Sequence, residues 1–173
     1  DNPAKVVPVG FNKALSIAKG NVIIRVDGHA TINSNYIEQC LKSFEKTGAE
    51  CVGGPIRNCS LGVIGEAISI AQSSKFGTGG VSFRSAINEG KYVTTLAFGA
   101  YKRAIFNTIG GYDEELIRNQ DDEFNMRLIQ SGGKIWLDPS IKSFYYSRSS
   151  LLSFTKQYFQ YGFYKIRVMQ KRK

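Results

Sequence analysis

The chain has 173 residues, of which 42% are hydrophobic, and this composition predicts one soluble globular domain with a substantial core. There are 23 Lys and Arg against 14 Asp and Glu, a net charge of +9 that suits nucleic acid, an anionic membrane surface or a phosphate-bearing substrate without choosing among them. Cys40, Cys51 and Cys59 match neither a zinc pattern nor a disulfide framework, and no apolar run is long enough to span a bilayer. An odd number of cysteines indicates reduced thiols and a cytosolic setting.

The first sixty residues alternate between helical and extended patterns. Residues 10–20 predict a helix ended by Gly20, and residues 21–28 predict a buried strand. Residues 34–48 predict a helix capped by Ser34, and residues 49–58 a short strand that runs into a turn. This alternation predicts an α/β layered domain with largely parallel strands.

The rest of the chain is less regular. The Gly- and Ser-rich residues 75–91 predict a loop with short extended pieces. Around it we expect a helix over 61–74, a strand, turn and short helix over 92–111, a helix over 121–133, a strand over 134–139 and a helix from 153 onward.

Asp27 and His29 follow the predicted strand directly, two residues apart. The carboxyl ends of strands in a parallel sheet face the crevice where ligands bind, and an extended backbone points residues i and i+2 the same way. The pair therefore has two interpretations. One is a turn with polar decoration, and the other is a pair of ligands for a metal that holds a phosphorylated substrate.

Three adjacent acids, Asp121, Asp122 and Glu123, open the predicted helix over 121–133. Acids in a first turn are common because they complement the helix dipole. A partly buried carboxylate beside other acids also has a raised proton affinity, which suits a general base. Arg127 stands four residues after Glu123, where an ion pair can hold the helix face.

The C-terminal stretch from Phe154 to Lys173 is aromatic and basic. One interpretation is a solvated chain end. A second is that its rings pack on the domain's own core. The alternative is contact with a membrane surface, to which the rings and cations both contribute. The rings are Tyr158, Phe159, Tyr161, Phe163 and Tyr164, and the cations are Lys165, Arg167, Lys171, Arg172 and Lys173.

Four segments, taken together and in order, resemble the family 2 inverting glycosyltransferases, which have the GT-A fold. "GFNKALSIAKGNVIIRVDGH" resembles the helix, strand and DxD segment of that family, and "VGGP" resembles the strand that follows. "FGAYKRAIFNTIGGYDEEL" resembles its acceptor-side block, and "QDDEFNMRL" its E-D-x-E-L-x-x-R-L block. The likeness covers nearly the whole chain and is strongest to the branch that builds exopolysaccharides of the succinoglycan type.

The resemblance implies a role for several residues. Asp27 and His29 fall on the first and last positions of DxD, which implies a divalent metal, manganese or magnesium. Asp121 falls on the catalytic base, and Gln120 replaces the Glu that usually precedes it. The nucleotide-sugar side would include Gly10, Asn12 and Asp27, and the acceptor or sugar side would include Gly99, Gly111, Tyr112, Asp113 and Gln120.

The function implied is transfer of a single sugar, with inversion, from a UDP-sugar to a hydroxyl of a polysaccharide or lipid-linked acceptor. The enzyme would work at the cytoplasmic face of a bacterial membrane, with no nucleic acid partner. The processive Q-x-x-R-W motif is not found, which favours single-sugar transfer.

The family's opening strands are also not found in this sequence. We therefore expect residues 1–150 to be a partial GT-A catalytic domain, truncated at its N-terminus, with a mixed and mainly parallel sheet. Residues 151–173 are expected to form a basic aromatic helix. Such a fragment is expected to be inactive alone and to form a homodimer through an unpaired strand edge.

Two other functions compete with this interpretation. A non-catalytic basic module for nucleotides or nucleic acid would give Asp27, His29 and Asp121 no role and would bind less tightly as salt rises. A nucleotidyltransferase would need a Gly-rich phosphate loop with basic residues near its start, which the chain does not show.

Overall fold

A computed structural model of the chain describes residues 2–60, 62–74, 82–84, 87–148 and 150–171. The helices are α1 (Val7–Ile17), α2 (Tyr36–Thr47), α3 (Gly62–Ser73), α5 (Ala104–Ile109), α6 (Gln120–Gln130) and α7 (Leu151–Lys171), with a 3-10 helix at Ser82–Arg84. The strands are β1 (Val22–Ile24), β2 (Ala30–Ile32), β3 (Cys51–Gly53), β4 (Ile56–Cys59), β5 (Lys91–Val93), β6 (Ala100–Lys102), β7 (Ile135–Leu137) and β8 (Ser143–Tyr146).

The strands form two mixed sheets, so the α/β class is confirmed while the expected parallel majority is wrong. The larger sheet has the order β1-β6-β3-β7-β5, and the smaller has the order β2-β8-β4. Among the described strands only β3–β7 and β4–β8 pair in parallel. The alternation of the first sixty residues predicted neighbouring parallel strands, but β1 and β3 are not neighbours. β6 comes from much later in the chain, lies between them and runs antiparallel to both.

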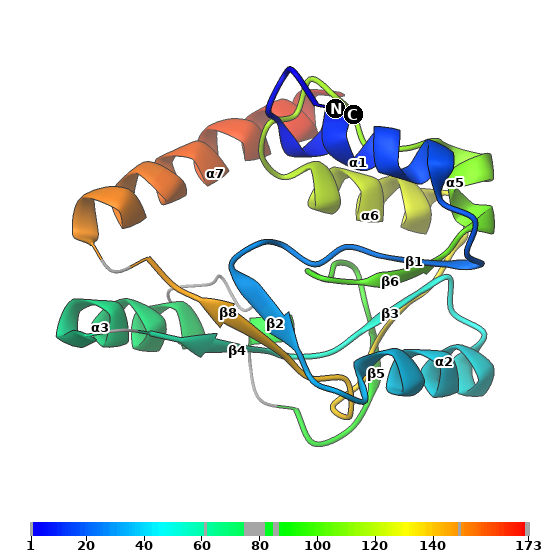
Figure 1. Ribbon diagram of the computed structural model, residues 1–173, viewed down its shortest axis with the longest axis horizontal. Helices are drawn as coiled ribbons and strands as arrows, with labels where there is room; N and C mark the ends of the chain where they lie inside the picture. Colours follow the sequence, from blue (N-terminus) through cyan, green and yellow to red (C-terminus); the bar gives the residue numbers. More distant parts are fainter. Residues whose placement is uncertain (1, 61, 75–81, 85–86, 149, 172–173) are drawn as a thin grey trace.

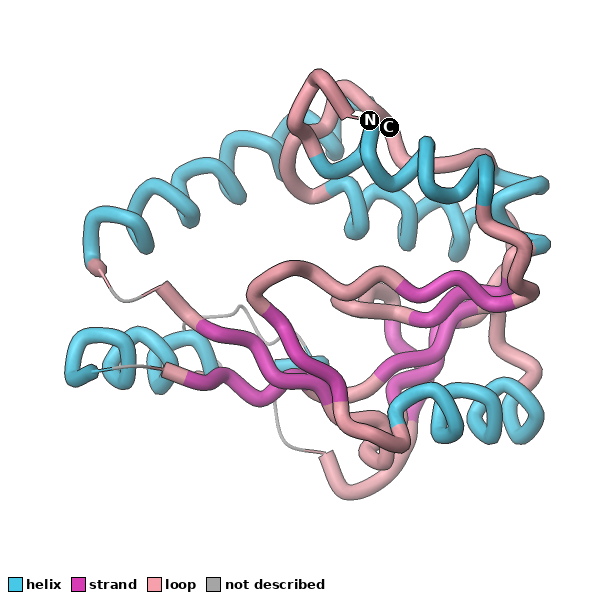
Figure 2. The backbone as a smooth tube through the Cα atoms, viewed as in Figure 1, coloured by secondary structure: helices cyan, strands magenta, loops and turns pink. Residues whose placement is uncertain are grey.

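Helices cover both faces of the larger sheet, and the two faces bury different cores (Figure 1; Figure 2 shows the strands as the middle layer). On one face, α1, α5 and α6 pack an aromatic cluster. Phe11 stacks on Tyr112 with ring centroids 4.2 Å apart, and Phe106 stacks on Phe124 at 4.9 Å. On the other face, α2 buries a second, smaller cluster that includes Phe44. Full burial of one such side chain contributes about 1.5–3 kcal/mol, so these clusters fix the position of α1 and α6 over the sheet.

Most predicted helices are present, with shifted ends. Asn35 rather than Ser34 is the N-cap residue of α2, and its side chain makes no capping hydrogen bond. Gly48 ends α2 at φ +67°, as expected for a residue that must adopt the left-handed region. Much of the loop predicted over 75–91 lies outside the described residues. None of the helices in the described part of the chain is long and apolar enough to cross a bilayer.

Candidate active site

A cavity of about 1000 Å³ lies between the loop after β1, the start of α6 and the inner face of α7. Its wall includes Asp27 and His29 from the loop, and Asp121 from the first turn of α6. Asp121 is far from Asp27 and His29 in the sequence. The fold brings them together because β1 ends, and α6 begins, at this edge of the larger sheet.

Asp27 is held in place by Arg25, which precedes it by two residues. Arg25 Nε donates to Asp27 Oδ1 at 2.8 Å, and Nη2 donates to Oδ2 at 3.1 Å. The Arg25 guanidinium also lies over the Tyr112 ring, 5.7 Å from its centroid. Desolvation lowers the pKa of Arg25, but the charges of Tyr112, Asp121 and Asp27 outweigh it and raise that pKa, so the guanidinium stays charged. Its Nη1 is buried without a hydrogen-bond partner among the described residues.

His29 shares the cavity wall with Asp27, and its ring meets the Tyr145 ring edge to face at 4.9 Å. A carboxylate and an imidazole suit Mn²⁺, whereas Mg²⁺ depends more on oxygen ligands. In the described part of the chain no group of three His, Cys, Asp or Glu side chains is placed to hold an ion alone. Asp27 and His29 could supply two ligands to such an ion, which would need further ligands from elsewhere.

The three adjacent acids at the start of α6 have different surroundings. Asp121 lines the cavity, and its Oδ1 accepts a hydrogen bond from the backbone N–H of Asp122 at 3.0 Å. The Asp122 carboxylate is paired with Lys165 of α7 at 2.5 Å. Glu123 is fully buried and forms a two-pronged ion pair with Arg127 at 2.7 and 2.9 Å. Of these three acids, Asp121 alone presents to the cavity a carboxylate with no direct Lys or Arg contact among the described residues.

The surroundings of Asp121 favour its protonated form. Burial raises the pKa of this carboxyl above its usual value, and Arg25 opposes that rise in part. The nearby acids Asp122 and Asp27 add to it. A carboxylate with raised proton affinity at the wall of a cavity can accept a proton from a bound hydroxyl.

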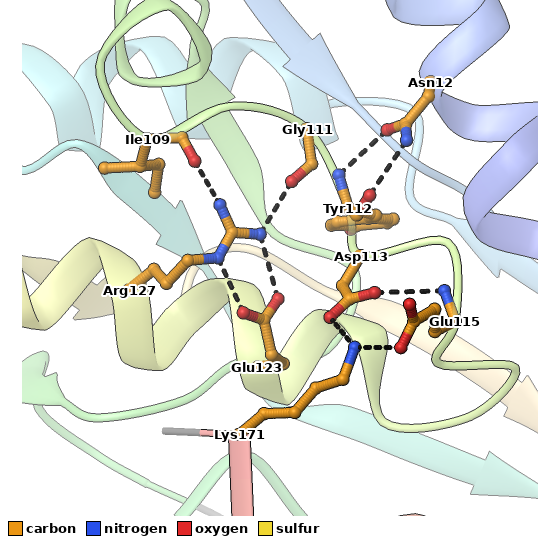
Figure 3. A network of polar contacts seen from close by, with 9 residues as sticks. All are labelled: Asn12, Ile109, Gly111, Tyr112, Asp113, Glu115, Glu123, Arg127 and Lys171. Carbon is orange, nitrogen blue, oxygen red and sulfur yellow. Dashed lines mark hydrogen bonds and ion pairs between the residues drawn. The ribbon is translucent and has the colours of Figure 1, made fainter. Parts of the chain in front are cut away.

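The loop after α5 is fixed by Asn12 of α1 (Figure 3). The Asn12 side chain donates to Tyr112 O at 2.9 Å and accepts from Tyr112 N at 2.8 Å. It pairs with that backbone as a neighbouring strand would. Gly111 allows this approach, because a Cβ there would stand 2.4 Å from Asn12 Oδ1. The Asn12 amide is therefore engaged with the loop, and it lies outside the cavity wall.

Two basic residues complete the fixation of this loop (Figure 3). Arg127 of α6 donates to the carbonyl of Gly111 at 2.6 Å and also to that of Ile109. Lys171, at the end of α7, pairs with Asp113 at 2.7 Å and with Glu115 at 2.5 Å. The loop that resembles the family's acceptor block is thus tied to α1, α6 and α7 together.

Not every residue expected at the site reaches the cavity. Gln120 reaches the cavity wall and is buried in it. Its Oε1 has no hydrogen-bond partner among the described residues. Gly99 lies directly before β6 and packs against β3, where a Cβ would stand 2.8 Å from Cys51 Sγ. Gly10 lines a separate groove between α1 and β1. The expected donor-side and acceptor-side residues that lie outside the cavity wall are Gly10, Asn12, Gly99, Gly111, Tyr112 and Asp113.

The inner face of α7 supplies Gln157, which the sequence did not single out, and two rings, Tyr158 and Tyr161, that were considered for contact with a membrane. Gln157 donates to the hydroxyls of Tyr145 and Tyr161, and its Oε1 is buried without a hydrogen-bond partner in the described chain. Tyr158 and Tyr161 line the cavity, whereas Phe159 is exposed. The signal was the helical spacing of Gln157, Tyr161 and Lys165, which places them on one face.

Searches against known proteins identify two curated relatives. The chain is 30% identical over 164 residues to the succinoglycan biosynthesis protein ExoA of Rhizobium meliloti (strain 1021), covering 94% of this chain and 49% of the relative. It is 32% identical over 158 residues to a dolichyl N-acetyl-alpha-D-glucosaminyl phosphate 3-beta-D-2,3-diacetamido-2,3-dideoxy-beta-D-glucuronosyltransferase of Methanococcus voltae, covering 88% and 49%. The chain thus spans about half the length of these relatives.

Solved structures share its fold. GalNAc-T7 with UDP, GalNAc and Mn²⁺ matches 81% of this chain and 30% of its own, with TM-score 0.58 and 16% identity. TarS 1–349 of S. aureus with UDP-GlcNAc matches 80% and 38%, with TM-score 0.52 and 19% identity. These neighbours confirm the GT-A type of fold.

The family model described as "Glycosyl transferase family 2" matches residues 7–110, which include α1, β1 and the Asp27–His29 segment. This match spans more than half of the chain and agrees with the fold and with the curated relatives. The chain belongs to glycosyl transferase family 2.

Proposed function

We propose that the protein containing this chain is an inverting glycosyltransferase that moves one sugar from a nucleotide-diphosphate sugar, a UDP-sugar by preference, to a hydroxyl of a polysaccharide or lipid-linked acceptor. The observation that carries the proposal is the single cavity that holds Asp27, His29 and Asp121. The family supports a transferase, and a UDP-GlcNAc complex and an Mn²⁺ complex among the solved neighbours support the donor and the metal.

Asp121 acts as the base in this proposal. The acceptor hydroxyl oxygen forms a bond to the anomeric carbon while the bond from that carbon to the diphosphate oxygen breaks. The hydroxyl proton passes to Asp121, and attack from the face opposite the leaving group inverts the anomeric centre. Asp122 is excluded from the role because Lys165 already neutralises it.

Asp27 and His29 would hold the divalent ion, which when bound neutralises charge that develops on the leaving diphosphate. Arg25 keeps the Asp27 carboxylate aimed at the cavity through its two hydrogen bonds. The second Arg25 amino group, Nη1, is buried and has no partner in the described chain, so it is available to an anionic oxygen of the donor.

Gln120 and Gln157 orient the acceptor in this proposal. Each has a buried side-chain oxygen in the cavity wall with no hydrogen-bond partner in the described chain. A buried hydrogen-bond acceptor without a partner costs about 1–3 kcal/mol of folding free energy. A sugar hydroxyl that donates a hydrogen bond to it would recover this cost. Two such oxygens, contributed by α6 and α7, can fix the orientation of one ring.

We also propose that the enzyme works at the cytoplasmic face of a membrane. The support is the outer face of α7, where Phe159, Phe163 and Ile166 are all exposed. The same helix carries Lys and Arg residues, and anionic lipid attracts such a combination of rings and cations.

The test is turnover of a panel of sugar nucleotides by the complete natural protein in the presence of Mn²⁺. The expected result is release of a nucleoside diphosphate from one donor, with the product anomer opposite to the donor anomer by NMR. Asp121→Asn should abolish release while leaving donor binding intact. Retention of the anomeric configuration, or release that Asp121→Asn leaves unchanged, would contradict the proposed mechanism. Binding of nucleic acid without any turnover would favour the non-catalytic module instead.

A further inference from the structure

One wall of the cavity carries three basic side chains with no acidic partner. Arg84 comes from the 3-10 helix, Arg148 follows β8, and Lys156 lies in the second turn of α7. No ion pair among the described residues involves any of them. Gathering like charges costs free energy unless an anion neutralises them, so this wall is prepared for a negatively charged group.

The position of Arg84 is fixed by its neighbours. Its Nη1 donates to Asn58 Oδ1 at 3.3 Å, and Asn58 in turn donates to the hydroxyl of Ser73 at the end of α3 at 3.1 Å. The guanidinium lies over the Tyr145 ring, 5.7 Å from the centroid. Arg84 is therefore placed beside β8 and the end of α3.

The chain just before Arg148 is tied to the same end of α3. Ser147 Oγ donates to Gln72 Oε1 at 2.9 Å, and Gln72 precedes Ser73 directly. Two arginines thus stand at one corner of the cavity. Arginine is suited to phosphate because its planar fork can donate two parallel hydrogen bonds.

The start of α7 adds the third cation and an apolar surface. Lys156 precedes Gln157, which donates to the Tyr145 hydroxyl at 3.1 Å and so brings this turn of α7 to the same ring that Arg84 covers. Leu151 and Leu152 in the first turn are 63% and 82% exposed. Ser153, the next residue, lines the cavity, so these leucines lie directly beside its wall. Cations in the wall with exposed leucines next to them match an amphiphile with an anionic head.

α3 adds a further exposed apolar side chain near this corner of the cavity. It contacts α7, and its Ile70, two residues before Gln72, is 66% exposed. Free phosphate would use only the cations and would leave these apolar side chains without a partner. A phosphate that carries a lipid chain would use both, and that is the occupant the surface favours.

We propose that Arg84, Arg148 and Lys156 bind the phosphate of a lipid-linked acceptor, whose chain leaves the cavity across Ile70, Leu151 and Leu152. The inference rests on the proposed transferase function and assigns the acceptor end of that site. The acceptor sugar then lies between this phosphate and Asp121, where the two unpartnered glutamine oxygens can meet it.

The experiment measures binding to the complete natural protein by calorimetry, with octyl phosphate below its critical micelle concentration as the probe. Inorganic phosphate and octyl glucoside separate the contribution of the charge from that of the chain, and UDP with Mn²⁺ reports the donor side. The variant is Arg148→Gln combined with Lys156→Gln. Lys142→Gln is the matched control, since Lys142 is exposed and outside the cavity wall.

We expect octyl phosphate to bind more tightly than both other acceptor probes and to lose at least about tenfold in affinity in the double variant, with UDP binding unchanged. Leu152→Ser should remove the advantage of octyl phosphate over inorganic phosphate. If the double variant loses UDP binding as much as octyl phosphate binding, these cations belong to the donor and the proposal is wrong. An equal loss of octyl phosphate affinity in Lys142→Gln, or no loss in the double variant, would also overturn it. Failure of the transferase proposal would appear separately, as absence of UDP binding and turnover in the unmodified protein.

Discussion

Arg25 holds both carboxylate oxygens of Asp27, with distances of 2.8 Å from Nε to Oδ1 and 3.1 Å from Nη2 to Oδ2. Arg25 is mostly buried and Asp27 is partly exposed to the cavity. A divalent ion at Asp27 must therefore share this carboxylate with a guanidinium. The ion should bind the protein with nucleotide more tightly than the protein alone, because a diphosphate attracts it more strongly. We therefore expect metal binding to depend on the nucleotide.

The first prediction concerns this metal. Asp27→Ala and His29→Ala should each weaken Mn²⁺ binding in the presence of UDP by at least about tenfold, because each removes a donor atom at the cavity wall. Calorimetric titration of Mn²⁺ into the UDP complex is the measurement. Glu38→Ala, which removes an exposed carboxylate on α2, is the control. Unchanged affinity in both site variants would show that these residues are a decorated turn.

The second prediction separates the two neighbouring acids. Asp121→Asn should lower turnover by roughly 10² to 10⁴-fold, the usual contribution of a general base. Asp122→Asn should have a much smaller effect, because the Asp122 carboxylate serves an ion pair with Lys165. Steady-state kinetics with UDP binding measured in parallel decides between them. A larger loss for Asp122→Asn would place the base one residue later.

The third prediction concerns stability and pH. The folded-state pKa of Asp121 is raised, chiefly by burial, so the folded chain holds that proton more tightly than the unfolded chain. The ionised carboxylate therefore costs stability above its folded pKa, and this cost disappears as pH falls below the unfolded value. Asp121→Asn should raise Tm at neutral pH, and its advantage should shrink toward acid pH. A variant less stable than the parent at pH 7 would contradict this origin of the pKa shift.

The sequence was sufficient for the main helices, and it named residues that the structure brings to one cavity. Helical spacing predicted α1, α2 and α6. Asp27 was singled out by its position after a strand, and Asp121 was chosen among three adjacent acids by the family resemblance. It was not sufficient for the sheet order, because β6 enters between β1 and β3 from a distant segment. The strands β2 and β8 have three and four residues, too few to show a period of two.

The sequence also could not distinguish binding residues from those that hold a loop. Asn12 was predicted to approach a nucleotide, but its amide pairs with the backbone of Tyr112. Nothing local to Asn12 reveals a partner that lies a hundred residues later in the chain. The inner face of α7 was hidden for a similar reason, since its rings and cations equally suit a membrane helix and a cavity wall.

The fourth prediction concerns the outer face of α7. Phe159 and Phe163 are 74% and 46% exposed, and Arg167 lies 4.8 Å from the Phe163 centroid. The chain should co-sediment with vesicles that contain anionic phosphatidylglycerol more than with phosphatidylcholine vesicles. Phe159→Ser with Phe163→Ser should reduce this binding, while Ile37→Ser on α2 should not. Equal sedimentation with both lipids would count against a membrane role for this helix.

The last prediction concerns the free edge of the larger sheet. Among the described strands β1 pairs only with β6, so its other edge has unpaired backbone groups. Beside β1 lies a groove of about 580 Å³ against α1, with apolar residues such as Leu15 and Val26 in its wall. An apolar edge of this kind pairs readily with a second copy, and a two-fold dimer closes it. The 173-residue chain should therefore dimerise in sedimentation equilibrium at micromolar concentration. Val26→Lys should weaken the dimer, because it places a charge in the apolar groove beside β1, while Val63→Lys on exposed α3 should not. A monomer across this concentration range would show that the groove and edge do not attract a second copy.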